Sequence, residues 1–143
     1  MTSHNVRQQA FRRMMAREAG TEANAPAIAA AARRVCEDFA RQFTPLIGDA
    51  GVEAIFARSL HLTKRNVRGL APGRASDKKD PPFALLQLFL EQQEPAAATE
   101  TAVAVLAMAS ELLASFIGES LTARLLSEAW PDDFAADTTE ETT

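Results

Sequence analysis

The sequence predicts an all-α protein: a single-domain bundle of about five or six helices, with two related helix–glycine–helix units. Three observations support this fold class. Apolar residues recur at helical spacing through most of the 143 residues, and a segment around residue 48 is echoed around residue 118. With eight Phe, one Trp and no Tyr, the core must also be built mostly from Ala, Leu, Ile and Val. A chain of this length has room for one domain with one core.

The first half of the chain predicts three helical segments. Residues 5–19 have Val, Ala, Phe and Met at helical spacing. Residues 26–43 form the next segment, where Pro26 suits the first turn of a helix. Gly48 then interrupts the chain, and Asp49 can cap the helix that follows.

The middle of the chain predicts one long loop followed by a short apolar helix. Residues 63–82 contain two Gly and three Pro and show no periodicity. Loops this long within a compact domain are usually functional or disordered. Residues 83–93 (FALLQLFLEQQ) are apolar enough for a peripheral helix that closes the core or docks on a partner.

The helix predicted over residues 96–117 has two apolar rows. One consists of Val103, Leu106, Leu113 and Ile117 with Ser110 among them, and the other of Val105, Met108, Leu112 and Phe116. Because a helix that is apolar on two sides is usually buried, we expect it in the centre of the bundle.

The chain ends with another helix and an acidic tail. Residues 119–130 continue the helical pattern up to Trp130, which precedes a proline. We expect residues 1–130 to form the helical domain, and residues 131–143 (PDDFAADTTEETT) to be a disordered acidic tail.

An internal echo is the most specific feature of the sequence. At an offset of 70 residues, Leu46-Ile47-Gly48-Asp49 aligns with Phe116-Ile117-Gly118-Glu119. In both copies an Ala-rich helix reaches a glycine, an acidic residue follows, and another helix begins. The acidic residue is favourable at a helix N-terminus. Two such junctions are compatible with a pseudo-two-fold axis, although similarity by chance between Ala- and Leu-rich helices remains an alternative.

The composition argues against an enzyme and against a metal site. Cys36 is the only cysteine, and beside Glu37 it is expected to be a small buried side chain and no reactive thiol. His4 and His61 are far apart in the chain, and we interpret His61 as a helix-end residue. No catalytic triad, zinc pattern or phosphate-binding loop is found, so we expect no cofactor.

The N-terminus lacks the apolar region of a secretory signal. The most apolar stretch, residues 101–117, is interrupted by Glu111 and is shorter than the ~20 residues of a membrane span. We therefore expect a cytoplasmic protein. Arginine outnumbers lysine twelve to three and alanine is abundant, which favours a bacterial source.

Charge divides the chain into two parts. Residues 1–80 have a net charge of +6 and residues 81–143 a net charge of −10. Two basic clusters were considered as binding surfaces, one in the N-terminal helix and one in the long loop. The candidate residues are Arg12, Arg13 and Arg17, with Arg7 beside them, and Lys64, Arg65, Arg68, Arg74, Lys78 and Lys79.

These features predict a non-catalytic regulatory protein that binds another protein, with a homodimer as one form of that partner. One alternative is a nucleic-acid-binding regulator that uses the two basic clusters, against which stand the acidic net charge of −4 and the absence of aromatic residues in the loop. A second alternative is a sensor that binds a small apolar ligand inside the bundle. A third places the N-terminal helix on a membrane surface, with Phe11, Met14 and Met15 facing the lipid.

Overall fold

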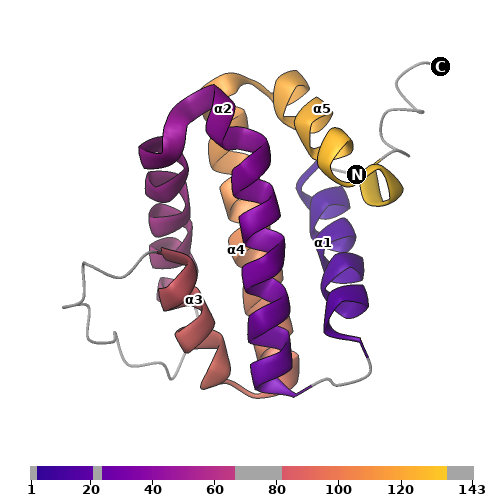
Figure 1. Ribbon diagram of the computed structural model, residues 1–143, viewed down its shortest axis with the longest axis vertical. Helices are drawn as coiled ribbons and strands as arrows, with labels where there is room; N and C mark the ends of the chain where they lie inside the picture. Colours follow the sequence, from indigo (N-terminus) through magenta and orange to yellow (C-terminus); the bar gives the residue numbers. More distant parts are fainter. Residues whose placement is uncertain (1–2, 21–23, 67–81, 135–143) are drawn as a thin grey trace.

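The computed structural model describes residues 3–20, 24–66 and 82–134, and every element in these ranges is helical (Figure 1). The predicted all-α bundle is therefore confirmed. The helices are α1 (Ser3–Ala19), α2 (Ala25–Asn66), α3 (Pro82–Glu91), α4 (Pro95–Ile117) and α5 (Glu119–Ala129).

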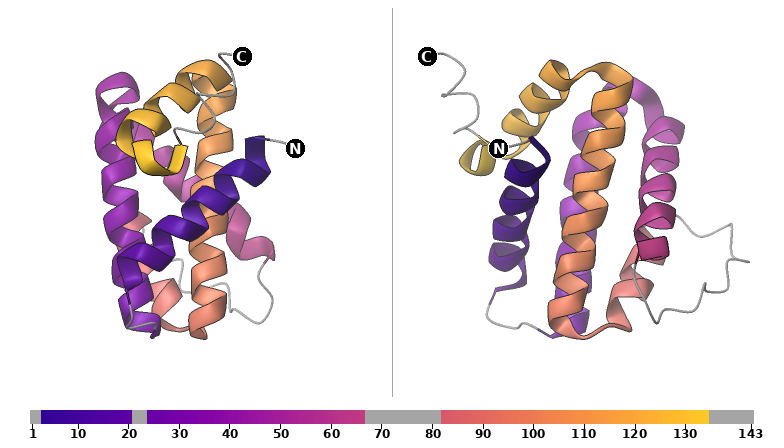
Figure 2. Two further views of the ribbon diagram at one scale, coloured as in Figure 1. Left: turned by 90° about the vertical axis from the view of Figure 1, so that its right-hand side faces the viewer. Right: turned by 180° about the vertical axis from the view of Figure 1, so that it is seen from behind.

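Two long parallel helices form the middle of the bundle. The first part of α2, up to Gly48, and the whole of α4 run in the same direction and bend at the same end of the molecule (Figure 1). The second part of α2 returns along one side, with α3 beyond it, and α5 returns along the other side towards α1 (Figures 1 and 2). α1 packs against both α2 and α4, whereas α3 packs mainly against α2.

The two bends have the same backbone conformation. Gly48 has φ 84° and ψ 162°, and Gly118 has φ 101° and ψ 150°. This region of φ/ψ space is essentially restricted to glycine, because a Cβ atom would strain the backbone there. The echo in the sequence thus corresponds to two helix–glycine–helix units with equivalent junctions, as predicted.

Burial follows the same 70-residue offset. Residues of the two units that align with each other are buried together along both long helices and beyond the bends. The pairs in which both members are buried are Ile28/Ala98, Ala31/Thr101, Ala32/Ala102, Val35/Val105, Cys36/Leu106, Phe39/Ala109, Phe43/Leu113, Val52/Thr122, Phe56/Leu126 and Thr63/Asp133. Each unit therefore presents the same positions to the shared core.

Aromatic side chains gather at the centre of this core. The ring centroid of Phe39 lies 4.8 Å from that of Phe43, 5.2 Å from Phe56, 6.2 Å from Trp130 and 6.5 Å from Phe11. Ala109 occupies the equivalent position on α4. A large ring in one unit is thus matched by a methyl group in the other, which lets the two central helices interdigitate.

Two boundaries differ from those expected. α2 continues to Asn66, so the beginning of the segment expected to be a loop is helical, while residues 67–81 lie outside the described residues. At the other end, residues 131–134 form a helical turn and Phe134 is 3% exposed. The Phe134 ring packs 5.6 Å from that of Phe11, so the packed part of the chain extends at least to residue 134.

The two apolar rows of α4 have different environments. Val103, Leu106, Ser110 and Leu113 are buried, as expected for a central helix. In the second row, Met108 and Leu112 are only half-buried, and Phe116 is 71% exposed. Seen from behind, α4 lies in the foreground of the bundle (Figure 2, right). The expectation that both rows would be enclosed by the bundle was therefore wrong for this second row.

Candidate docking surface

The arginines of α1 face carboxylates of the second helix–glycine–helix unit. Arg12 donates to Glu100 of α4 through Nε at 3.0 Å and Nη2 at 2.7 Å. Arg17 donates to both carboxylate oxygens of Asp133, at 3.3 and 2.6 Å. Arg13 donates to the Asp133 main-chain oxygen at 3.2 Å. The basic face of α1 therefore contacts the acidic half of the same chain.

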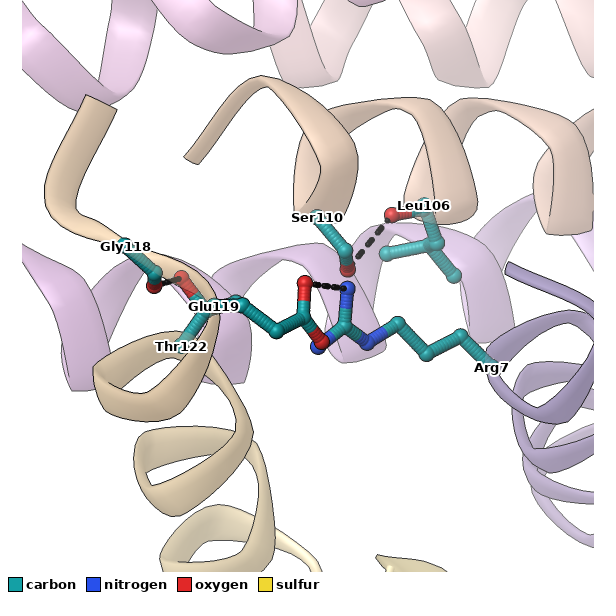
Figure 3. Close-up of polar contacts among 6 residues, drawn as sticks. All are labelled: Arg7, Leu106, Ser110, Gly118, Glu119 and Thr122. Atoms are coloured by element: carbon teal, nitrogen blue, oxygen red, sulfur yellow. Dashed lines mark hydrogen bonds and ion pairs between the residues drawn. The ribbon is translucent and has the colours of Figure 1, made fainter. Parts of the chain in front are cut away.

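Arg7 is the most buried of these arginines, with 3% of its surface exposed. It forms an ion pair with Glu119, the first residue of α5 (Figure 3). Its guanidinium group lies beside Ser110, whose hydroxyl donates to the Leu106 carbonyl oxygen at 3.0 Å. This pair ties the N-terminal helix to the residue that follows the Gly118 bend, where a carboxylate also complements the helix dipole.

These ion pairs explain the charge division in the sequence. Each joins a basic residue of the first unit to an acidic residue of the second, so the opposite charges of the two halves attract each other inside one molecule. The hydrogen bond from Arg12 lowers the pKa of the Glu100 carboxyl below its ordinary value. Because Arg12, Arg13 and Arg17 have partners in the chain, any role in binding another molecule stays a prediction.

The structure describes little of the second basic cluster. Lys64 and Arg65 belong to the last turn of α2, but the structure does not describe their side chains. Arg68, Arg74, Lys78 and Lys79 lie outside the described residues. The structure therefore does not bring the two predicted basic clusters together.

The residues considered for chemistry have ordinary environments. Cys36 is fully buried, and this burial, together with the nearby Glu37 charge, raises the pKa of its thiol. It thus behaves as the small buried side chain that we expected. Phe11, Met14 and Met15 are buried in the core, which contradicts the expectation that they face a lipid surface. Within the described ranges no group of His, Cys, Asp and Glu is arranged to hold a metal ion.

The open apolar feature of the surface is a row on α4. We call Ala104, Met108, Leu112 and Phe116 the α4 row; they follow one another at intervals of four residues on neighbouring turns. At 1.5 Å per residue the row is about 18 Å long. It begins half-buried at Ala104 and ends with the exposed ring of Phe116, next to the Gly118 bend.

The other central helix has a polar row at the equivalent positions. The offset of 70 residues aligns the α4 row with Arg34, Asp38, Gln42 and Leu46, which we call the α2 row. Arg34 donates to Glu18 at 3.2 Å, Asp38 pairs with Arg41, and Gln42 donates to Glu128 at 3.2 Å. Exposure is similar in the two rows: the two middle residues are half-buried in both, and Leu46 is 48% exposed.

The α4 row is surrounded by negative charge. Residues 82–123 contain five glutamates and no lysine or arginine. Glu100 precedes Ala104 by one helical turn, Glu111 lies one turn after Met108, and Glu119 follows Phe116 beyond the bend. Glu100 and Glu119 are each paired with an arginine of α1 on one flank of α4.

Sequence reasoning identified the residues of this row but assigned Met108, Leu112 and Phe116 to the core. The signal that distinguishes them is the internal echo itself. Extended back from Gly118, the offset places Met108 opposite Asp38 and Leu112 opposite Gln42. Charged and amide side chains are rarely fully buried, so positions equivalent to them are expected to be accessible.

Comparison with known proteins adds no functional information, because no family model matches the chain and neither a curated protein nor a solved structure is significantly similar to it. By length and composition, the 23-residue α4 is apolar enough to cross a membrane, which corrects the expectation based on residues 101–117. Half of its apolar window is buried within the bundle, as in the core helix of a soluble protein.

Proposed function

We propose that this protein is a non-catalytic interaction module that binds another protein through the α4 row. The observation that supports the proposal is the difference between two equivalent surfaces. The α2 row has polar side chains with partners inside the chain, whereas the α4 row has Met108, Leu112 and Phe116 at positions of comparable exposure. Apolar side chains that are not enclosed by their own protein mark surfaces for association.

The geometry suits recognition by a helix or an extended segment. Apolar residues at intervals of four are the anchors by which helices pack against each other. Met108 can adapt to different neighbours because its side chain is unbranched. The row lies on a long helix that is held by α1 and α2, so little ordering is required when a partner binds.

The nucleic-acid alternative is less well supported. It relied on the arginines of α1, and Arg7, Arg12 and Arg17 form ion pairs with Glu119, Glu100 and Asp133. The open row is apolar and acidic in its surroundings, which repels a phosphate backbone. A regulatory role in a bacterial cytoplasm is an expectation from the sequence and forms part of this proposal.

The test is a pull-down from a lysate of the source cell, with and without nuclease, using wild-type protein and the variant Met108→Gln/Leu112→Gln. This variant converts the middle of the α4 row into the kind of side chain found in the α2 row and preserves helix propensity. We expect a nuclease-resistant protein that the wild type retains and the variant loses. Retention of every captured protein by the variant would contradict the proposal.

A matched control changes the equivalent positions of the other unit. The variant Asp38→Ala/Gln42→Ala removes two polar side chains of the α2 row that make surface contacts only within the chain. It should capture the same partner as the wild type. Circular dichroism and melting temperature of both variants show whether the bundle has remained folded.

A further inference from the structure

We infer that the α4 row accepts a basic amphipathic helix, that is, a helix with an apolar side bordered by lysine or arginine. The inference rests on the proposed function and specifies the chemistry of its partner. It is supported by the charge around the row and by the way in which α4 already binds a helix on its neighbouring flank.

The chain contains an example of this type of contact. α1 is a basic amphipathic helix: Ala10, Phe11, Met14 and Met15 are buried against the bundle, and its arginines lie at the border of that apolar side. It packs against α4, where Arg12 pairs with Glu100, and its Arg7 pairs with Glu119. One flank of α4 therefore already combines apolar contact with arginine–carboxylate pairs.

The α4 row continues this surface beyond the contact with α1. Its apolar side chains start one turn after Glu100, the residue paired with Arg12, and Glu111 adds a carboxylate along the row. Because α3, α4 and the first turn of α5 have no basic residue, the partner must supply the positive charge. Complementary charge at the rim sets the orientation of a bound helix and accelerates association.

The same charges argue against other occupants. A second copy that docked by the same row would bring Glu100, Glu111 and Glu119 near their own counterparts, and like charges in close contact are unfavourable. An anionic lipid surface or a nucleic acid would face the same repulsion. A basic helix is the occupant for which both the apolar row and its acidic border are favourable.

The probe is a fluorescein-labelled model peptide of leucine and lysine with helical amphipathic periodicity, and its partner is the full-length protein. Binding is measured by fluorescence anisotropy at low and high salt. We expect binding that weakens with salt and weakens about tenfold in Met108→Gln/Leu112→Gln, a change large enough to measure reliably. This variant retains every charge of the protein, so unspecific electrostatic binding would be equal in variant and wild type.

Two further probes test the charge. A peptide with glutamate in place of each lysine presents the same leucines and should bind much more weakly. The substitution Glu111→Gln should weaken binding of the lysine peptide and leave the glutamate peptide unaffected or slightly improved. Asp38→Ala/Gln42→Ala is the control that should not alter either affinity.

The outcomes separate this inference from the proposed function. Equal binding of the lysine peptide to the wild type and to Met108→Gln/Leu112→Gln overturns the inference, and so does equal binding of the two peptides. If the pull-down partner is nevertheless lost in that variant, the proposed function stands with a partner of different chemistry. If size-exclusion chromatography shows a dimer that the same variant dissociates, the occupant is a second copy and the inference is wrong.

Discussion

The two helix–glycine–helix units of this protein have the same backbone path and different side chains. Gly48 and Gly118 share one conformation, and the residues that each long helix turns towards the core lie at the same offset. On the outer side, however, α2 has Arg34, Asp38 and Gln42 where α4 has Ala104, Met108 and Leu112. The bundle thus depends on the glycine bends and the buried positions, whereas the outer positions are free to serve another purpose.

The comparison also concerns the core. Phe39 of α2 and Ala109 of α4 occupy equivalent buried positions with very different volumes. The two units are therefore not interchangeable: the aromatic side chains of the first fill the space left by the small residues of the second. Equivalence of position does not imply equivalence of energetic contribution.

The largest expected effect comes from breaking this core asymmetry. Phe39→Ala should lower the free energy of unfolding by about 3–5 kcal/mol, because it removes a fully buried ring in contact with four others. Ala109→Phe should lower it by about 1–3 kcal/mol through overpacking. Urea denaturation followed by circular dichroism measures both. A smaller effect for Phe39→Ala than for Ala109→Phe would show that the aromatic cluster is not the centre of the core.

The next effect tests the equivalence of the two bends. Gly48→Leu and Gly118→Leu should each lower the free energy of unfolding by about 1–3 kcal/mol, because a Cβ-bearing residue is strained at these φ/ψ values. Strain is the whole cause, since no heavy atom lies within 4 Å of the Cβ position at either glycine. Chemical denaturation of the two variants should give similar losses.

The neighbouring residues supply controls for the bends. Ala50 and Ser120 are exposed helical residues at equivalent places after the two glycines. Ala50→Leu and Ser120→Leu should change stability by no more than about 0.5 kcal/mol. Small effects at both glycines, comparable to these controls, would contradict the equivalence of the junctions.

The smallest effects concern the charges that join the units. Arg17→Met leaves the nearly buried carboxylate of Asp133 without its bidentate partner, and we expect a loss of about 1–2 kcal/mol, reduced by the exposure of Arg17 to solvent. Arg12→Met breaks an exposed pair and should cost about 0.2–1 kcal/mol. Thermal unfolding at low salt measures the difference. Equal losses would mean that burial of Asp133 does not matter.

The pH dependence of the Arg12–Glu100 pair has a definite sign. Its hydrogen bond lowers the pKa of Glu100 in the folded protein, so the stabilisation is present at neutral pH and is lost as the pH falls through that value. In Arg12→Met the pKa of Glu100 should return towards its ordinary value. An NMR titration of the Glu100 carboxyl carbon checks this shift, and an unchanged pKa would contradict the assignment of its cause.

Much of the fold could be predicted from the sequence because helices have local causes. Apolar spacing indicated the helices, and glycine followed by an acidic residue located both bends. The expectation of a tail from residue 131 failed because Phe134 is buried against Phe11, a contact between residues far apart in the chain. Helix content is local, whereas burial of a terminal segment depends on what lies opposite it.

The candidate surface was harder to predict for the same reason. Periodicity showed that α4 is apolar on two sides, but it did not show that only one of them is covered. The arginines of α1 were recognised as a cluster, yet their carboxylate partners lie about 90–120 residues away in the chain. A single sequence does not encode such pairings in any local pattern.

The sequence by itself determined the helices, the two glycine bends and the opposite charges of the two halves, because these follow from backbone conformation, residue spacing and ionisation. Only the tertiary structure decided that the arginines of α1 are paired with the second unit and that the row from Ala104 to Phe116 is not enclosed by the bundle. The physical reason is that burial and pairing depend on which helices lie side by side. That arrangement results from the packing of the whole core, and no single segment specifies it.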